Sequence, residues 1–168
     1  MAKTSYAIAL GSNRPSRHGS PAETLRAAVA AIEEQGFEVK ALSTIRATPA
    51  LGPAGRAFAN AAAIVAASLE PPELLDQLKA TETWFGRRSG RRWGPRVLDL
   101  DIILWSEGPW EGSGLTIPHP CFRERSFVLD PLAEIAPEWR DPITATTVRQ
   151  LRTRLAARRP VDRAPTPS

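Results

Sequence analysis

The chain holds very little cysteine and no long hydrophobic run. Cys121 is the only cysteine among 168 residues, which excludes a fold held together by internal disulfides. No apolar run approaches the roughly 20 residues that a membrane-spanning helix needs, and the opening residues lack the apolar stretch of a secretory signal. We therefore expect a cytoplasmic protein without a membrane partner.

Length and composition favour one ordinary globular domain. The sequence is 42% hydrophobic and 24% charged, and its length leaves no room for a second large unit. Residues 158–168 are rich in proline and charge, a composition typical of disorder. We expect a single domain over residues 1–157, a disordered tail over residues 158–168, and a monomer.

The net charge of +4 suggests an anionic partner, and the arginines show where it would bind. Five of them fall in one ten-residue stretch: Arg87, Arg88, Arg91, Arg92 and Arg96. Nucleic acid, a nucleotide and a merely solvated loop all fit such a cluster. The Walker-type loop with Gly-Lys-Ser/Thr is missing from the sequence, so any bound phosphate must be held by side chains instead.

Hydrophobic spacing and turn residues predict an α+β fold. Ser20 and Glu23 form the capping box of a first helix, which has Pro21 at its first position and stops at Gly36. A second helix runs from Pro71 to Gly86. Strands are predicted at 5–10, 37–48, 58–68 and 97–105, although the alanines of 58–68 leave a helix open there. The order βαββαβ is that of a ferredoxin-like core, an antiparallel sheet with helices packed on it.

The last third of the chain adds elements to this core. Residues 106–114 are glycine-rich and predict a hairpin region, followed by a short strand at 115–117. Residues 127–136 and 147–157 are spaced as two extra C-terminal helices.

Two acids lie inside the most strand-like segment. Because strand side chains alternate between faces, Leu98, Leu100, Ile102 and Leu104 should share a core face and Asp99 and Asp101 the other. Carboxylates at i and i+2 start roughly 6.5 Å apart at the backbone, so their oxygens can converge on a cation. Oxygen-only ligation suits Mg²⁺. The alternative is an exposed strand face whose acids pair with nearby arginines.

The segment around these acids resembles the signature of the 6-hydroxymethyl-7,8-dihydropterin pyrophosphokinases. The likeness is strongest from Arg92 to Ile103, RWGPRVLDLDII, and extends over about residues 6–137. It includes ALGSN at 9–13, TPALGP at 48–53, FANAA at 58–62, TIPHP at 116–120 and RSFVLDPL at 125–132. The resemblance implies transfer of pyrophosphate from ATP to the hydroxymethyl group of the pterin, giving AMP and the pterin diphosphate for folate biosynthesis.

The resemblance also implies a role for each matching residue. It gives Asp99 and Asp101 as ligands of two Mg²⁺ ions, and Arg87 and Arg96 as catalytic contacts to the ATP phosphates. Further ATP contacts are Glu82, His119 and Arg125. The implied pterin pocket consists of Thr48, Pro49, Leu51, Phe58, Asn60, Trp93 and Phe127. Trp93 would close over the pterin with the 87–95 loop, which we expect to be mobile until ligands bind.

Plainer interpretations stay open for several of these residues. Phe58 and Phe127 fit a hydrophobic core as well as a pocket for a flat ring, and Asn60 fits an ordinary turn or edge position. A ferredoxin-like RNA-binding module is an alternative for the whole chain, but the aromatic RNP pattern that it needs is missing from the sequence. A non-catalytic homologue is the other alternative, and the presence of Asp99, Asp101, Arg96 and His119 argues against it.

Overall fold

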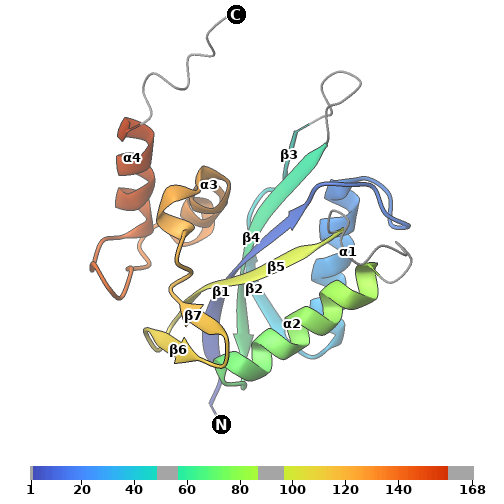
Figure 1. Cartoon of the computed structure of the whole chain (residues 1–168), viewed down its shortest axis with the longest axis horizontal. Coiled ribbons are helices and arrows are strands. Elements are labelled where there is room, and N and C mark those ends of the chain that lie inside the picture. The colour runs from blue at the N-terminus through green and yellow to red at the C-terminus, as the bar shows by residue number, and fades with distance from the viewer. Residues whose placement is uncertain (1, 49–56, 87–96, 159–168) are drawn as a thin grey trace, which may run out of the picture.

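A five-stranded antiparallel sheet forms the centre of the protein (Figure 1). The computed structural model describes residues 2–48, 57–86 and 97–158. The sheet order is β2-β4-β1-β5, and β3 also pairs with β4. The strands are β1 (Thr4–Ser12), β2 (Glu38–Leu42), β3 (Arg46–Thr48), β4 (Phe58–Ala67) and β5 (Asp99–Trp105). This order confirms the predicted ferredoxin-like core.

Two helices cover one face of the sheet, α1 (Pro21–Glu34) and α2 (Pro71–Gly86) (Figure 1). The predicted capping box is present, because the Ser20 hydroxyl accepts from the Glu23 amide and the Glu23 carboxylate accepts from the Ser20 amide. Leu25 and Ile32 of α1 and Leu74 of α2 are buried against the sheet. This face holds the larger hydrophobic core.

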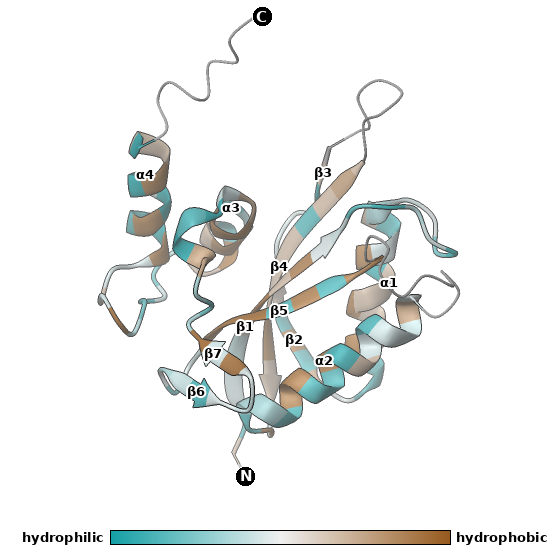
Figure 2. Ribbon diagram, viewed as in Figure 1, coloured by the Kyte–Doolittle hydropathy of each residue, from teal (hydrophilic) through white to brown (hydrophobic). Residues whose placement is uncertain are grey.

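Two further helices cover part of the opposite face, α3 (Ser126–Ile135) and α4 (Val148–Arg158) (Figure 1). A short 3₁₀ turn, Phe122–Glu124, precedes α3, and the hairpin of β6 (Trp110–Gly112) and β7 (Leu115–Ile117) follows β5. α3 and α4 each carry both apolar and polar residues (Figure 2), and their buried apolar residues, among them Leu129 of α3 and Leu151 of α4, join one core cluster with residues of the sheet. In the part of the chain that the structure describes, no helix is long and apolar enough to cross a membrane.

The prediction of one continuous strand over residues 37–48 was wrong. The segment divides into β2 and β3, which pair with different parts of β4. Between them, Ser43 bonds to Ala62 through both its backbone amide and its hydroxyl, and the Thr44 amide donates to the Glu134 carboxylate. Side-chain bonds therefore replace the regular ladder at this point and separate the strands.

Leu104 does not share a face with Leu98, Leu100 and Ile102, contrary to prediction. Ile8 pairs with Ile102 whereas Ala7 pairs with Leu104, so Ile103 is an extra residue in β5. Such a bulge reverses the alternation beyond it. Leu104 consequently packs with α3 and α4, and the next residue, Trp105, joins the core under α1 and α2.

Candidate functional site

The candidate site lies on the sheet face beside α3, where two rows of side chains cross the central strands. In the first row, Gly11 of β1 pairs with Asn60 of β4 on one side and with Asp99 of β5 on the other. In the second, Ala9 pairs with Ala62 and with Asp101. Directly opposed residues point to the same face of a sheet. The register therefore places both carboxylates on one side of small central residues and Asn60 on the other side.

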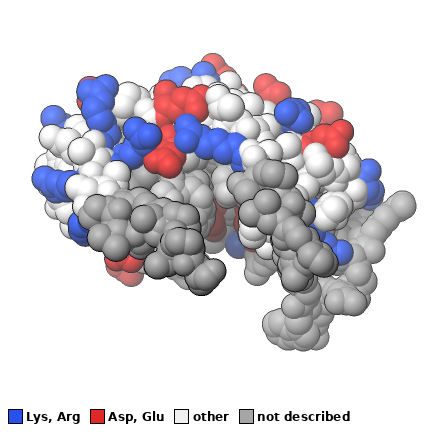
Figure 3. All heavy atoms as spheres, turned by 90° about the horizontal axis from the view of Figure 1, so that it is seen from above, with Lys and Arg blue, Asp and Glu red and all other residues white. Residues whose placement is uncertain are grey.

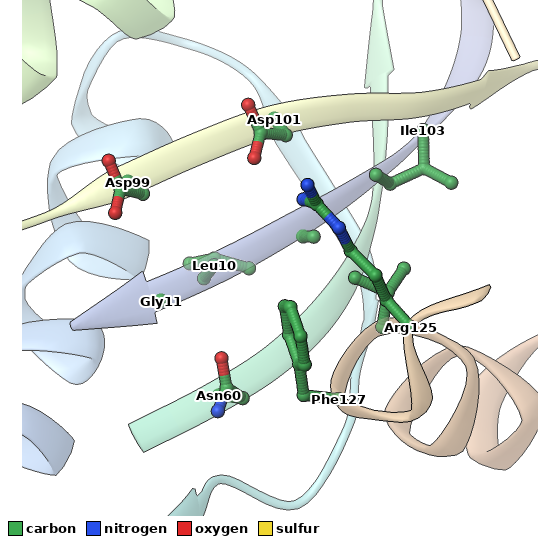
Figure 4. Close-up of a pocket in the computed structure, with 10 residues that line it drawn as sticks. Leu10, Gly11, Asn60, Asp99, Asp101, Ile103, Arg125 and Phe127 are labelled. Atoms are coloured by element: carbon green, nitrogen blue, oxygen red, sulfur yellow. The ribbon is translucent and has the colours of Figure 1, made fainter. Parts of the chain in front are cut away.

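The small residues of β1 leave a hollow between β5 and α3. At Gly11 an added Cβ would lie 3.3 Å from Oδ1 of Asn60, closer than ordinary contact, so a larger residue there would displace the Asn60 side chain. The resulting cavity, of about 340 Å³, is lined by both aspartates, Asn60, Arg125 and Phe127, among others. Figure 4 shows Asp99 and Asp101 along β5 and Asn60 and Phe127 across the hollow from them.

A second, more apolar cavity of about 360 Å³ adjoins the first and shares Gly11, Asn60, Asp99 and Phe127 with it. Phe58 completes its aromatic lining. The exposed fractions of Phe58 and Phe127 are 45% and 50%, which excludes the core role left open for them. Two exposed phenyl rings beside an amide suit a flat heterocycle with polar edges.

Arg125 brings positive charge to the acidic side of the hollow. It is the N-cap residue of α3, and its guanidinium carbon lies 5.7 Å from the centre of the Phe127 ring. In Figure 4 its side chain extends from α3 toward β5, where Asp101 lies. A guanidinium here can contact a phosphate oxygen in the same cavity.

His119 is held in one tautomer at the edge of this group. Its backbone amide donates to the carbonyl of Ile103 (3.0 Å), and its Nδ1 accepts from the Cys121 amide (3.1 Å), so the proton is on Nε2. Burial lowers the pKa of His119; the negative charge of Asp101 opposes this shift and Arg125 adds to it. His119 is therefore a neutral hydrogen-bond donor at pH 7.

Glu82 binds the backbone of the edge strand β5 beside Asp99 and Asp101. Its side chain is buried, and Oε2 accepts from the backbone amide of Leu100 at 2.6 Å, between Asp99 and Asp101. Lys79 lies 3.4 Å from its Oε1. Because β5 is the last strand in the sheet order, this bond satisfies an amide that has no neighbouring strand on that side.

The donor set fits a magnesium ion that relies on its substrate for ligands. Among the described residues, no three histidine, cysteine or acidic side chains gather as a metal cage. Mg²⁺ commonly takes one or two carboxylates and completes its shell with water and phosphate oxygens. Asp99 and Asp101, half-buried at a cavity that also holds Arg125, meet this requirement.

The structure brings most of the described candidates together. Asp99, Asp101, Asn60, Phe58, Phe127 and Arg125 line the two cavities, and Thr48 ends β3 opposite Phe58. Several predicted site residues lie outside the described residues, and so does the loop that was expected to be mobile. These residues are Arg87, Arg96, Trp93, Pro49 and Leu51. Sequence reasoning missed Gly11 and Ala9 as the floor of the hollow. The signal was there, because small residues alternate with Tyr6, Ile8 and Leu10 along β1.

Surface charge is mixed on the face shown in Figure 3. Lysines and arginines alternate there with acidic residues, and the described residues show no broad basic patch on it. A phosphate backbone would need such a patch or stripe. This face therefore gives the RNA-binding alternative no support.

Comparison with known proteins decides the family. Residues 7–137 match the 7,8-dihydro-6-hydroxymethylpterin-pyrophosphokinase (HPPK) family. The chain belongs to this family. The predicted resemblance is thereby confirmed, and the RNA-binding alternative is not favoured.

Curated relatives and solved structures agree with membership of the HPPK family. A 2-amino-4-hydroxy-6-hydroxymethyldihydropteridine pyrophosphokinase of Pseudomonas aeruginosa is 41% identical over 137 residues, covering 80% of this chain and 82% of that protein. One from Synechocystis is 47% identical over 116 residues, covering 69% of this chain but only 60% of the relative. The Plasmodium falciparum HPPK-DHPS structure superposes with a TM-score of 0.71 at 13% identity, covering 94% of this chain and 42% of that one, and so shares the fold.

Proposed function

We propose that this protein transfers pyrophosphate from ATP to the hydroxymethyl oxygen of 6-hydroxymethyl-7,8-dihydropterin. The proposal is carried by two adjoining cavities in a member of the HPPK family. One is lined by Asp99, Asp101 and Arg125, and the other, the aromatic slot, is lined by Phe58 and Phe127. One cavity suits a metal-bound polyphosphate and the other a flat ring. The four residues that they share place the ring beside the phosphate chain.

In this reaction the pterin oxygen forms a bond to the β-phosphorus of ATP. The bond between that phosphorus and the oxygen bridging to the α-phosphorus breaks, AMP leaves, and the hydroxyl proton passes to solvent. Asp99 and Asp101 would hold Mg²⁺, which when bound neutralises phosphate charge and polarises the phosphoryl group. The protein would contribute mainly by positioning its two substrates and by matching charge.

Each described site residue has a role in this proposal. Phe58 and Phe127 stack on the pterin, and the Asn60 amide bonds to its polar edge. Arg125 and His119 donate to phosphate oxygens, and Glu82 supports the nucleotide side through β5. From the family resemblance we also assign Arg87 and Arg96 to the ATP phosphates and Thr48, Pro49, Leu51 and Trp93 to the pterin.

The direct test is product identification. The protein is incubated with ATP, Mg²⁺ and the pterin alcohol, and the nucleotide product is separated and identified by mass. AMP together with the pterin diphosphate supports the proposal, and their loss on adding EDTA supports the magnesium requirement. ADP would mean transfer of a single phosphate, and no turnover would overturn the proposed activity.

A further inference from the structure

An ion-paired network connects α3 to the segment that begins β3, on the far side of the aromatic slot from the aspartates. Glu134 of α3 uses both carboxylate oxygens for it. Oε2 accepts from the backbone amide of Thr44 (2.8 Å) and from its hydroxyl (3.0 Å), and Oε1 accepts from Nη2 of Arg46 (3.1 Å). These three bonds join residues about 90 positions apart in the chain.

The strand that Glu134 holds is itself weakly supported. β3 has three residues, and among the described residues its one partner strand is β4, where Arg46 faces Asn60 and Thr48 faces Phe58. A strand this short has few ladder bonds of its own. The network therefore supplies a second attachment for the sheet edge that lies beside the Phe58–Asn60 segment.

The same helix carries the opposite wall of the slot. Phe127 projects from the first turn of α3 and Glu134 lies in its last turn, while Val128, Leu129 and Leu132 between them are buried against the sheet. Phe58 is the first residue of β4 and lies one position beyond the last residue of β4 that pairs with β1, so the strand residue opposite it is Thr48 of β3. A shift of β3 relative to α3 would therefore move Phe58 relative to Phe127. The hydrogen bond from the Thr44 amide, and after it the one from the Arg46 guanidinium, lower the pKa of Glu134. Both interactions therefore favour the ionised carboxylate.

We propose that Glu134 is a positioning residue for the substrate ring: through Thr44 and Arg46 it fixes β3 and the Phe58–Asn60 segment relative to Phe127. The inference rests on the proposed function for the identity of the ring. Glu134 lines neither cavity, so its effect is exerted through the walls of the slot.

The test compares ring binding with nucleotide binding in matched variants. Titration calorimetry measures the Kd of 6-hydroxymethylpterin in the presence of Mg²⁺ and α,β-methylene-ATP, and the Kd of the nucleotide analogue alone. Glu134→Ala should raise the pterin Kd roughly tenfold, the lower end of the effect that loss of a residue supporting a metal ligand has at metal sites, and leave the nucleotide Kd within about twofold. Glu134→Gln keeps one oxygen acceptor and should fall in between.

Two further variants separate positioning from general stability. Glu138→Ala breaks an exposed ion pair with Arg149 and should change neither Kd. Arg46→Gln leaves α3 intact and should raise the pterin Kd in the same direction, with a less than additive effect in the double variant Arg46→Gln/Glu134→Gln. If Glu134→Ala fails to fold, the pterin Kd values of Arg46→Gln and Glu134→Gln still test the positioning role, with Glu138→Ala as the control.

The outcomes distinguish this inference from the proposed function. A wild-type protein that binds no pterin overturns the proposed function. If wild type binds pterin and Glu134→Ala binds it with the same Kd, the positioning role alone is overturned. Equal weakening of pterin and nucleotide also overturns it, because the network would then support the whole fold and not the slot.

Discussion

Asp141 is fully buried and accepts hydrogen bonds from three different residues, so replacing it should destabilise the protein strongly. Its side chain is 0% exposed and lies in the loop between α3 and α4. It accepts from Nε and Nη2 of Arg123, from the Ile143 amide and from Oγ1 of Thr144. Arg123 belongs to the 3₁₀ turn before α3, so this group fastens the loop to the segment between His119 and Arg125.

The magnitude follows from what Asp141→Ala leaves behind. The ion pair with Arg123 contributes about 1.5–3 kcal/mol, and the bonds from two neutral donors, the Ile143 amide and the Thr144 hydroxyl, add about 1 kcal/mol each. Their sum, about 3.5–5 kcal/mol, lies within the range of about 3–5 kcal/mol for removing one member of a buried ion pair. Since Arg123 is 28% exposed and can regain some water, we expect about 3 kcal/mol. For a chain of this length that lowers Tm by roughly 6–12 °C.

Thermal unfolding followed by circular dichroism tests this value, and its pH dependence tests the cause. Burial raises the pKa of Asp141, but the bonds from Arg123, Ile143 and Thr144 outweigh it, so the pKa lies below its usual value. The stabilisation is therefore complete above the unfolded-state pKa of about 4 and is lost as pH falls through the lower folded-state pKa.

The difference in Tm between wild type and Asp141→Ala should accordingly narrow below about pH 4. The control is Glu138→Ala, whose ion pair is 62% and 68% exposed and whose Tm should stay within roughly 2 °C of wild type. If the Tm of Asp141→Ala at pH 7 lay within roughly 2 °C of the wild-type Tm, the reasoning would be refuted. A Tm difference between the two proteins that widens as the pH falls would also refute it.

Three further predictions concern the site. Asp99→Asn and Asp101→Asn should each lower kcat roughly a hundredfold or more with little change in Tm, because metal-supported charge stabilisation is worth several kcal/mol; near-normal rates at saturating Mg²⁺ would contradict the metal assignment. Phe127→Ala should raise the KM for the pterin roughly tenfold, from the about 1–3 kcal/mol of ring stacking, whereas a lower Tm at unchanged KM would mark a packing residue. Glu82→Gln should lower Tm by weakening the bond to the Leu100 amide, and an unchanged Tm with weaker ATP binding would make it a direct nucleotide contact.

Most of the fold follows from local sequence signals, and the failures have local causes too. Ser20, Pro21 and Glu23 are a sufficient signal for the start of α1, and Gly86 for the end of α2. The break within residues 37–48 depends on Glu134, about 90 positions away, which bonds to the Thr44 amide in place of a strand neighbour. Local propensity contains no information about such a partner.

The candidate site divides in the same way. Alternation along β5 is enough to place Asp99 and Asp101 on one face, and the resemblance supplied Phe58, Asn60, Arg125 and Phe127. What it could not supply is the register, in which Gly11 and Ala9 stand between the acids and the slot. Burial of Glu82 was likewise unpredictable, because its partner is a backbone amide and has no side-chain signature.

The bulge at Ile103 explains how one seven-residue strand serves both a polar site and two hydrophobic layers. Before the bulge, alternate residues of β5 send Asp99 and Asp101 into the hollow and Leu100 and Ile102 into the core under α1 and α2. Strict alternation would then turn Leu104 to that same core. The extra residue turns Leu104 toward α3 and α4 instead, beside Ile103. The sheet face that is open at the aspartates is thereby closed by apolar packing two residues later, and this packing anchors the helix that presents Arg125 and Phe127 to the site.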